Sequence, residues 1–210
     1  MSRNFYLPPK HHVPILEDPI NFYYIPVFKS FFIARLKATL SFADNEALGS
    51  VLDIGCGTGA LFPELKRRGG DYLVGIDTFV QEYSFKGLMK KEDVAADIAW
   101  ADAQYLPFKD DSFDTVVCIS ALEHIEDSKG TLEEIKRIIK PGGRFLGGVP
   151  TQNIITDKLL GESTGFHVSG HRKILNAAKQ VFGIIREKHI PGFVPLNLSL
   201  YVAFEGRKDY

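Results

Sequence analysis

The chain has 210 residues, of which 45% are hydrophobic and 24% are charged, and it has a formal net charge of −1 and a pI of about 6.6. These values predict one globular domain, or one domain with an extension, and they lack the basic excess typical of nucleic-acid-binding proteins. The two cysteines, Cys56 and Cys118, are too few for a disulfide framework and are typical of a reducing compartment.

Neither a secretory signal nor a transmembrane segment is evident. Residues 1–10 lack the apolar core and the small-residue cleavage site of a signal peptide. No stretch reaches the roughly 18 apolar residues that span a bilayer, since the most apolar segment, 22–42, is interrupted by Pro26 and three basic residues. We therefore expect a cytoplasmic protein without stable membrane insertion. The sequence does not indicate an oligomeric state.

The first 45 residues are predicted to form an irregular arm, over 1–20, followed by a helix. Large apolar side chains recur at helical spacing over residues 27–43, with Arg35 expected largely on another face. These apolar residues are Phe28, Phe31, Phe32, Leu36 and Leu40. The segment 1–45 either packs on the sheet or forms a lid over a ligand site.

After residue 50, short apolar runs alternate with amphipathic segments. Strands are predicted at 51–54, 72–76, 95–101, 115–120, 144–149 and 184–190, followed by a last strand that alternates from Leu196 to Phe204. Helices are predicted at 60–68, 82–92, 131–140 and 171–182. This order predicts a doubly wound α/β fold with a mostly parallel sheet covered on both faces.

The helix predicted to begin at Thr131 has clear local signals. Thr131 and Glu134 have the spacing of a capping box, and Glu133 and Arg137 are spaced to pair on the outer face. Pro141 is expected to end the helix before the next strand.

A glycine-rich loop follows the first predicted strand. Gly55, Gly57 and Gly59 stand at alternate positions, so a ligand can lie against the backbone, and the next helix offers its N-terminal N–H groups to an anionic group. Because ligands of such sheets bind beyond the carboxyl ends of the strands, the site is expected just after residues 54, 76, 101 and 120. The structural alternative is a plain glycine-rich turn.

Two ligand classes compete for this loop. Residues 55–60 also fit the G-x-G-x-x-A form of the dinucleotide fingerprint, and Asp77 lies near the spacing of its ribose-binding acid. Asp53 distinguishes between these two ligand classes, because an acid inside an apolar strand is costly to bury without a partner. A positively charged sulfonium ligand with an ammonium group supplies that partner, whereas a pyrophosphate would be repelled.

The segment Val51–Gly59 resembles the first motif of class I S-adenosylmethionine-dependent methyltransferases. Four further segments resemble motifs of that family in the family's order, and together the resemblance covers 48–150. They are Leu73–Asp77, Ala101–Phe108, Phe113–His124 and Leu132–Gly143. The similarity is closest to the small-molecule branch called type 11.

The resemblance implies a seven-stranded sheet with an antiparallel last strand, formed by a cofactor-binding domain over 46–210. It implies S-adenosylmethionine as methyl donor, S-adenosylhomocysteine as product and a small-molecule acceptor, which the aromatic residues of 22–32 suggest is hydrophobic. In the family's pattern Asp77 holds the ribose hydroxyls, Asp102 accepts from the adenine amino group and the Ala103 N–H donates to the ring. The cofactor-binding residues expected are Asp53, Gly55, Cys56, Gly57, Gly59, Asp77, Thr78, Asp102, Ala103 and Ser120.

Two segments depart from the family's pattern. Residues 78–83 do not continue into the usual regular helix, and Phe79 there either stacks on the base or packs in the core. Residues 120–123 read Ser-Ala-Leu-Glu, which is not the tetrapeptide of enzymes that methylate DNA bases or glutamines. Nucleic acid is therefore not expected as a partner.

Three histidines are candidates for a general base, which is needed only if the acceptor is a poor nucleophile. His124 follows the fourth predicted strand, and a structural role at a helix start is its alternative; His167 and His171 follow the fifth. No Cys, His or carboxylate cluster has metal-binding spacing, so no metal is expected. An NAD-dependent oxidoreductase and a non-catalytic S-adenosylmethionine-binding module are the alternative functions.

Overall fold

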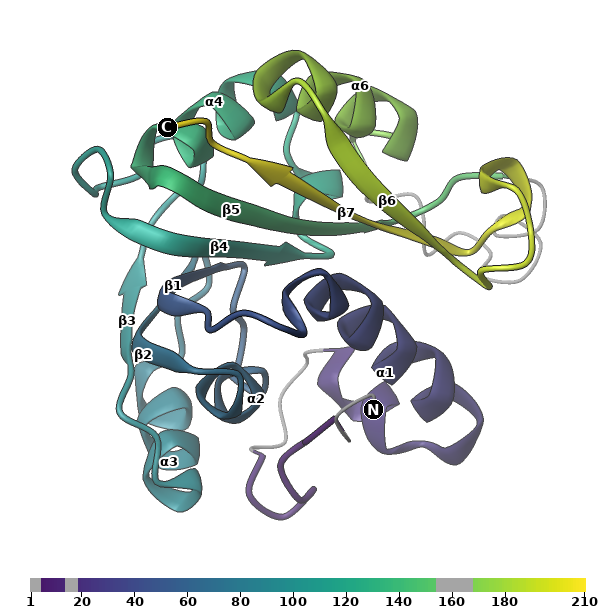
Figure 1. Cartoon of the computed structure of the whole chain (residues 1–210). Coiled ribbons are helices and arrows are strands. Elements are labelled where there is room, and N and C mark those ends of the chain that lie inside the picture. The colour runs from purple at the N-terminus through teal and green to yellow at the C-terminus, as the bar shows by residue number, and fades with distance from the viewer. Residues whose placement is uncertain (1–4, 14–18, 154–167) are drawn as a thin grey trace.

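In a computed structural model, described here over residues 5–13, 19–153 and 168–210, the protein is built on a seven-stranded sheet (Figure 1). The strand order is β3-β2-β1-β4-β5-β7-β6. β1 to β5 pair in parallel, and β7 is antiparallel to both of its neighbours. The strands are β1 (Gly49–Ile54), β2 (Gly70–Asp77), β3 (Asp97–Trp100), β4 (Phe113–Ile119), β5 (Ile139–Pro150), β6 (Ile185–Ile190) and β7 (Tyr201–Arg207). The predicted doubly wound α/β fold, including its antiparallel last strand, is confirmed.

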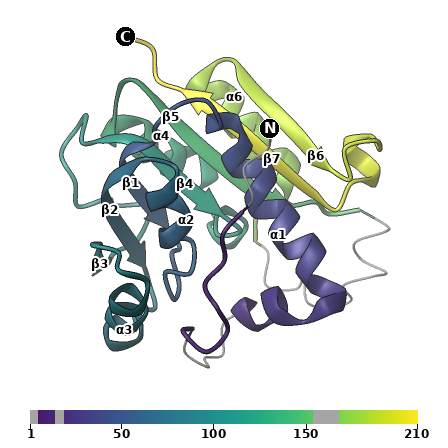
Figure 2. The same ribbon diagram turned by 60° about the horizontal axis from the view of Figure 1, so that its bottom comes forward.

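Helices cover both faces of the sheet. On one face lie α1 (Pro26–Leu40), α2 (Phe62–Arg67) and α3 (Glu82–Glu92), and on the other lie α4 (Ser128–Ile138) and α6 (His171–Phe182) (Figure 1). Figure 2 shows α1 crossing the sheet near β6 and β7, against which it packs. The described short 3₁₀ segments are η1 (Pro19–Tyr24), η2 (Ser41–Ala43), η3 (Leu122–His124) and η5 (Leu196–Leu198).

The core is divided in two by the sheet, because successive side chains of a strand point to opposite faces. Leu52 packs with Ile135 of α4 in one cluster, while its neighbour Val51 packs with Leu65 of α2 in the other. The solid apolar strands of the sequence therefore reflect burial on both faces. In the described ranges, no helix is both long and apolar enough to cross a membrane.

The topology brings the carboxyl ends of β1, β2 and β4 to one edge of the sheet. Ile54 at the end of β1 is paired with Ile76 of β2 on one side and with Cys118 of β4 on the other. β2 and β3 extend the sheet on one side of β1, and β4 and β5 extend it on the other side. The strand order therefore reverses between β1 and β4, and ligands of such sheets bind at the strand ends beside this switch point.

The predicted capping box of the fourth helix is wrong. α4 begins one turn earlier, at Ser128, and Asp127 caps it by accepting a hydrogen bond from Gly130 N at 2.9 Å. The Thr131 hydroxyl instead donates to the main-chain oxygen of Asp127, and Glu134 pairs with Arg137. The outward pair was also wrong, because Glu133 lies 3.5 Å from Lys129 rather than pairing with Arg137.

Two strand boundaries also differ from prediction. β5 begins at Ile139 and contains Pro141, so this proline lies in a strand rather than at a helix end. The apolar alternation that begins at Leu196 does not mark a strand there: residues 196–198 form η5, and the strand starts at Tyr201. The main-chain oxygen of Pro195 closes this turn, because it accepts hydrogen bonds from the N–H groups of Leu198 and Ser199.

Candidate active site

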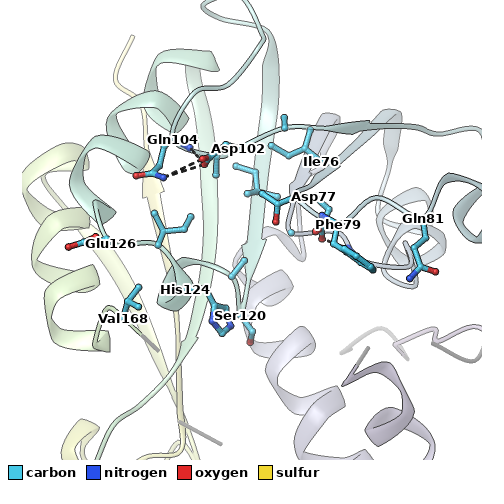
Figure 3. Close-up of a pocket in the computed structure, with 18 of the residues that line it drawn as sticks. Ile76, Asp77, Phe79, Gln81, Asp102, Gln104, Ser120, His124, Glu126 and Val168 are labelled. Atoms are coloured by element: carbon cyan, nitrogen blue, oxygen red, sulfur yellow. Dashed lines mark hydrogen bonds between the residues drawn. The ribbon is translucent and has the colours of Figure 1, made fainter. Parts of the chain in front are cut away.

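A pocket of about 850 Å³ lies at the carboxyl edge of the sheet, where the switch point predicts it (Figure 3). The ends of β1 and β2 line it together with the loops that follow β3 and β4. Figure 3 shows Asp102 and Gln104 at one end of this cofactor-side pocket and Ser120 and His124 at the other. Its lining includes seven of the ten residues expected from the sequence to bind a cofactor: Gly55, Gly57, Asp77, Thr78, Asp102, Ala103 and Ser120.

The glycine-rich loop after β1 has no room for a side chain at Gly55 or Gly59. Gly55, Gly57 and Gly59 all have positive φ, of 72°, 51° and 80°. A Cβ on Gly55 would lie 2.6 Å from that of Ala121, and a Cβ on Gly59 would lie 2.6 Å from the Phe85 ring of α3. Gly55 and Gly57 line the pocket, whereas Gly59 lies outside its lining and allows α3 to approach the loop.

Asp77 is held in a fixed orientation at the end of β2. Its Oδ2 accepts from Gly57 N at 2.9 Å and its Oδ1 accepts from Phe79 N at 2.8 Å. Both oxygens keep a lone pair for a ligand, which suits a pair of ribose hydroxyls. The neighbouring Thr78 carbonyl accepts from Trp100 Nε1 at 3.0 Å, which joins the loop to β3.

Two further features of this pocket fit a purine. The Phe79 ring lines the pocket and is 74% exposed, which excludes the alternative that it packs in the core and leaves its face free to stack on a base. Asp102 also lines the pocket, with Oδ1 accepting from Gln104 N at 2.9 Å, and next to it the buried Ala103 belongs to the same lining.

Asp53 is a buried acid with no cationic partner among the described residues. It is 4% exposed, and burial, reinforced by the negative charge of Asp77, raises its pKa to about 8. No described residue donates a hydrogen bond to its carboxylate. A cationic ligand would stabilise the ionised form, as the sequence argument required. Asp53 and Cys56 line a second pocket rather than the first.

The second pocket, of about 490 Å³, adjoins the first. Gly55, Gly57, Thr58, Ser120 and His124 line both pockets. Its lining also contains six aromatic residues from η1, α1 and β7: Phe22, Tyr23, Phe28, Phe31, Phe32 and Tyr201. We call this cavity the aromatic pocket.

Ser120 joins the two pockets. It follows β4 in the left-handed region, with φ of 57°, a conformation that costs energy for a residue other than glycine. Its hydroxyl accepts from Arg35 Nη1 at 3.2 Å and lies 3.1 Å from the Tyr201 hydroxyl. Arg35 thus faces the aromatic pocket, which corrects the expectation that it lies largely on another face of its helix.

The three candidate histidines separate in the structure. His124 lies at the junction of the two pockets (Figure 3). His171 begins α6, is 4% exposed and lines neither pocket; its Nδ1 accepts from Gln152 N at 3.1 Å, and burial lowers its pKa. His167 lies outside the described residues. Within the described ranges, no three His, Cys, Asp or Glu residues are placed to hold a metal ion.

Three residues of the aromatic pocket were not predicted: Arg35, Glu123 and Tyr201. Glu123 carries the same signal as Asp53, an acid within an apolar run, and could have been found by it. Tyr201 carries no such signal, because its apolar neighbours in β7 make it indistinguishable from a core residue.

Comparison with known proteins agrees with the motifs. A family model described as a methyltransferase domain, of type 11, matches residues 52–147. A sterol 24-C-methyltransferase of Gibberella zeae is 33% identical over 98 residues, which cover 45% of this chain and 26% of the relative. A ubiquinone biosynthesis O-methyltransferase of Paracidovorax citrulli is 33% identical over 96 residues, which cover 44% of this chain and 40% of the relative. The match thus spans less than half of either relative.

Solved structures show the same fold. The phosphoethanolamine N-methyltransferase 2 of Haemonchus contortus, solved in complex with S-adenosyl-L-methionine, superposes with a TM-score of 0.65 and 17% identity over 85% of this chain and 53% of that one. The matched segment, this fold and the five ordered motifs agree: residues 52–147 match the type 11 methyltransferase domain, as the resemblance to class I methyltransferases predicted.

Proposed function

We propose that the protein transfers a methyl group from S-adenosylmethionine to a small-molecule acceptor and releases S-adenosylhomocysteine. The observation that carries this proposal is a pair of acids at the carboxyl ends of the strands: Asp77 is oriented beside the glycine loop in the cofactor-side pocket, and Asp53 lies buried without a cationic partner in the lining of the adjoining pocket. A ligand with a ribose and a positive charge satisfies both carboxylates.

The donor is held by residues of both pockets. Asp77 takes the ribose hydroxyls, Phe79 stacks on the adenine, and Asp102 and the Ala103 N–H take its polar edge. Asp53 faces the positively charged methionine end, next to Gly55. The donor supplies an activated methyl group on a sulfonium, so the work of the protein is to hold an acceptor in line with that group and to exclude water.

The acceptor is placed in the aromatic pocket. This cavity adjoins the cofactor-side pocket and is lined by six aromatic side chains, which suit an apolar small molecule. Relatives named for a sterol and for ubiquinone biosynthesis support a small and largely apolar acceptor. The arm and α1, within residues 1–45, supply one wall of this pocket and act as its lid.

The two alternatives differ in what they predict. An NAD-dependent oxidoreductase is not favoured, because the pyrophosphate of NAD would lie near Asp53, which is buried without a cation among the described residues. A non-catalytic module would bind S-adenosylmethionine in the same pocket without turning it over.

Calorimetric titration of the wild-type protein with S-adenosylhomocysteine and, separately, with NAD tests the proposal. We expect S-adenosylhomocysteine to bind and NAD not to bind, and Asp77→Ala to weaken binding by at least tenfold through loss of the ribose contacts. Asp71→Ala is the matched control, because Asp71 is exposed on the same strand. Binding of NAD instead, or of neither ligand, would contradict the proposal.

A further inference from the structure

Polar groups gather at one end of the aromatic pocket. Arg35 and Tyr201 both contact the hydroxyl of Ser120, which lines the two pockets. Glu123 precedes His124, which also lines both pockets. A molecule in this cavity would have its body among aromatic rings and its reacting group beside these five side chains, next to the cofactor-side pocket.

Arg35 has unused hydrogen-bonding capacity. Its guanidinium carbon lies 4.1 Å from the centroid of the Phe32 ring, and its donations to the hydroxyls of Ser120 and Tyr23 are long, at 3.2 and 3.3 Å. Its Nε is shielded from solvent and has no hydrogen-bond partner. Among the described residues no carboxylate lies within ion-pair distance of it. A guanidinium in this state is suited to bind an oxygen that carries negative charge.

Glu123 is buried without a structural partner for its second oxygen. The residue is 3% exposed, and Oε2 makes no hydrogen bond. The main-chain oxygen of Glu123 accepts from Val168 N and Ser169 N, so η3 is held in place without the carboxylate. Burial raises the pKa of Glu123 to about 7, against the lowering effect of Arg35. A carboxylate with this pKa can both accept and release a proton near neutral pH.

The ionisable surroundings of Glu123 come from several elements. Arg35 of α1 and Tyr201 of β7 are coupled to it electrostatically. Asp53 of β1, Tyr23 of η1 and the adjacent His124 also line the aromatic pocket. Arg35 is the sole permanent cation in the described lining of this pocket, so it is the group that would stabilise a developing oxyanion.

We propose that the acceptor is a planar, largely apolar molecule with an acidic hydroxyl, a phenol or an enol, whose oxygen is oriented by Arg35 and whose proton is taken by Glu123. This inference rests on the proposed function and adds to it the reacting group of the acceptor. It assigns the proton to Glu123, which lines the aromatic pocket and whose Oε2 has no hydrogen-bond partner, rather than to one of the three histidines.

The step balances with the groups named. The hydroxyl proton moves to Glu123 Oε2, and a lone pair of the acceptor oxygen forms the new bond to the methyl carbon. The carbon–sulfur bond breaks, and its electron pair stays on sulfur, which becomes the neutral thioether of S-adenosylhomocysteine. Glu123 returns its proton to water when the products leave.

The test measures ionisation of a bound phenol rather than turnover. 4-Nitrophenol, whose phenolate is yellow and whose phenol is nearly colourless, is titrated from pH 6 to 9 with each protein saturated with S-adenosylhomocysteine. Arg35→Met should raise the pKa of the bound probe by about one unit, because the cation is lost, and Glu123→Gln should lower it by about one unit, because a neighbouring anion is lost. Glu123→Asp, which restores the charge, should lie near wild type.

Two controls separate this effect from damage to the fold. Lys37→Met removes an exposed cation from the same helix and should leave the pKa of the bound probe unchanged. Nitrobenzene, which lacks the hydroxyl, should bind wild type and Arg35→Met equally. Shifts of the same sign in Arg35→Met and Glu123→Gln, or no shift in either, would overturn the inference.

Failure of the proposed function can be distinguished from failure of this inference about the acceptor. If wild type does not bind S-adenosylhomocysteine, the proposed function is wrong and this inference falls with it. If S-adenosylhomocysteine binds and the ionisation of 4-nitrophenol does not respond to Arg35 and Glu123, only the inference about the acceptor is wrong.

Discussion

Asp53 shows how one residue can be costly for the fold and useful for the site. Its carboxylate is buried in β1 beside a second carboxylate, Asp77, and its pKa rises to about 8. In the ligand-free protein the carboxyl is therefore mostly protonated at neutral pH, and a cationic ligand favours its ionisation. We propose that the residue couples ligand binding to the release of a proton.

The pH dependence of unfolding tests this directly. The pKa of Asp53 is about 8 in the folded protein against a usual 3.8, so the folded state binds a proton more tightly than the unfolded state. Its contribution to stability is fully present below pH 3.8 and is lost as the pH rises toward 8. Asp53→Asn cannot ionise and should gain stability relative to wild type, by on the order of a few kcal/mol, between pH 5 and pH 9.

Thermal unfolding of the ligand-free proteins at these two pH values is the measurement. Asp71→Asn is the control, because its carboxyl is exposed on β2 and its loss should give the same difference from wild type at both pH values. If the advantage of Asp53→Asn does not grow with pH, Asp53 is ionised in the ligand-free fold.

At the scale of elements, α4 shows which signal decides where a helix begins. Thr131 and Glu134 have the correct spacing for a cap, yet Asp127 caps the helix one turn earlier, and Glu134 is drawn instead to Arg137 and to Leu106 N. Asp127 ranks with the strongest capping residues, so it competes well for the position. Because its contacts with Arg137 and Leu106 N occupy the Glu134 carboxylate, Glu134 does not make the hydrogen bond expected of it in the predicted capping box.

Asp127→Ala should lower the free energy of unfolding by about 1 kcal/mol, because Gly130 N loses its acceptor at the helix start. Glu133→Ala on the same helix is the control and should cost less than about 0.5 kcal/mol, since its pairing with Lys129 is exposed. Urea denaturation of both variants measures the difference. Equal losses would mean that Asp127 does not act as the cap.

At the scale of the whole molecule, residues 5–13 are fastened across α2 and α3. The Tyr6 N–H donates to Glu64 at 2.9 Å, and the Tyr6 hydroxyl donates to Glu92 at 2.8 Å. His12 Nδ1 lies 2.5 Å from the other oxygen of Glu92. Leu7 lines the aromatic pocket, so these contacts also position part of its wall.

Glu92→Ala should release this segment, because it removes the partner of both Tyr6 and His12. We expect tryptic cleavage after Lys10, which is exposed, to become several-fold faster. Glu82→Ala is the control on the same helix, since Glu82 contacts Lys86 on the exposed surface. Equal cleavage rates in the two variants would show that Glu92 does not hold the segment.

The sequence by itself determined the α/β fold, the position of the glycine loop and the resemblance to methyltransferases, because these depend on local patterns. Solid apolar runs predict buried strands, and Gly55 and Gly57 are required by backbone conformations that other residues rarely adopt. The buried acid Asp53 was also legible, since an acid in an apolar strand needs a partner.

Only the tertiary structure decided the composition of the aromatic pocket. Apolar side chains occur around most of α1, so the pattern along the helix does not tell which face Arg35 takes, and its place is decided by contacts with Ser120 and Tyr201. The burial of Glu123 depends on α1 and on residues 168–169, which are distant from it in the chain. Local periodicity carries no information about such contacts, because they form only when separate elements pack.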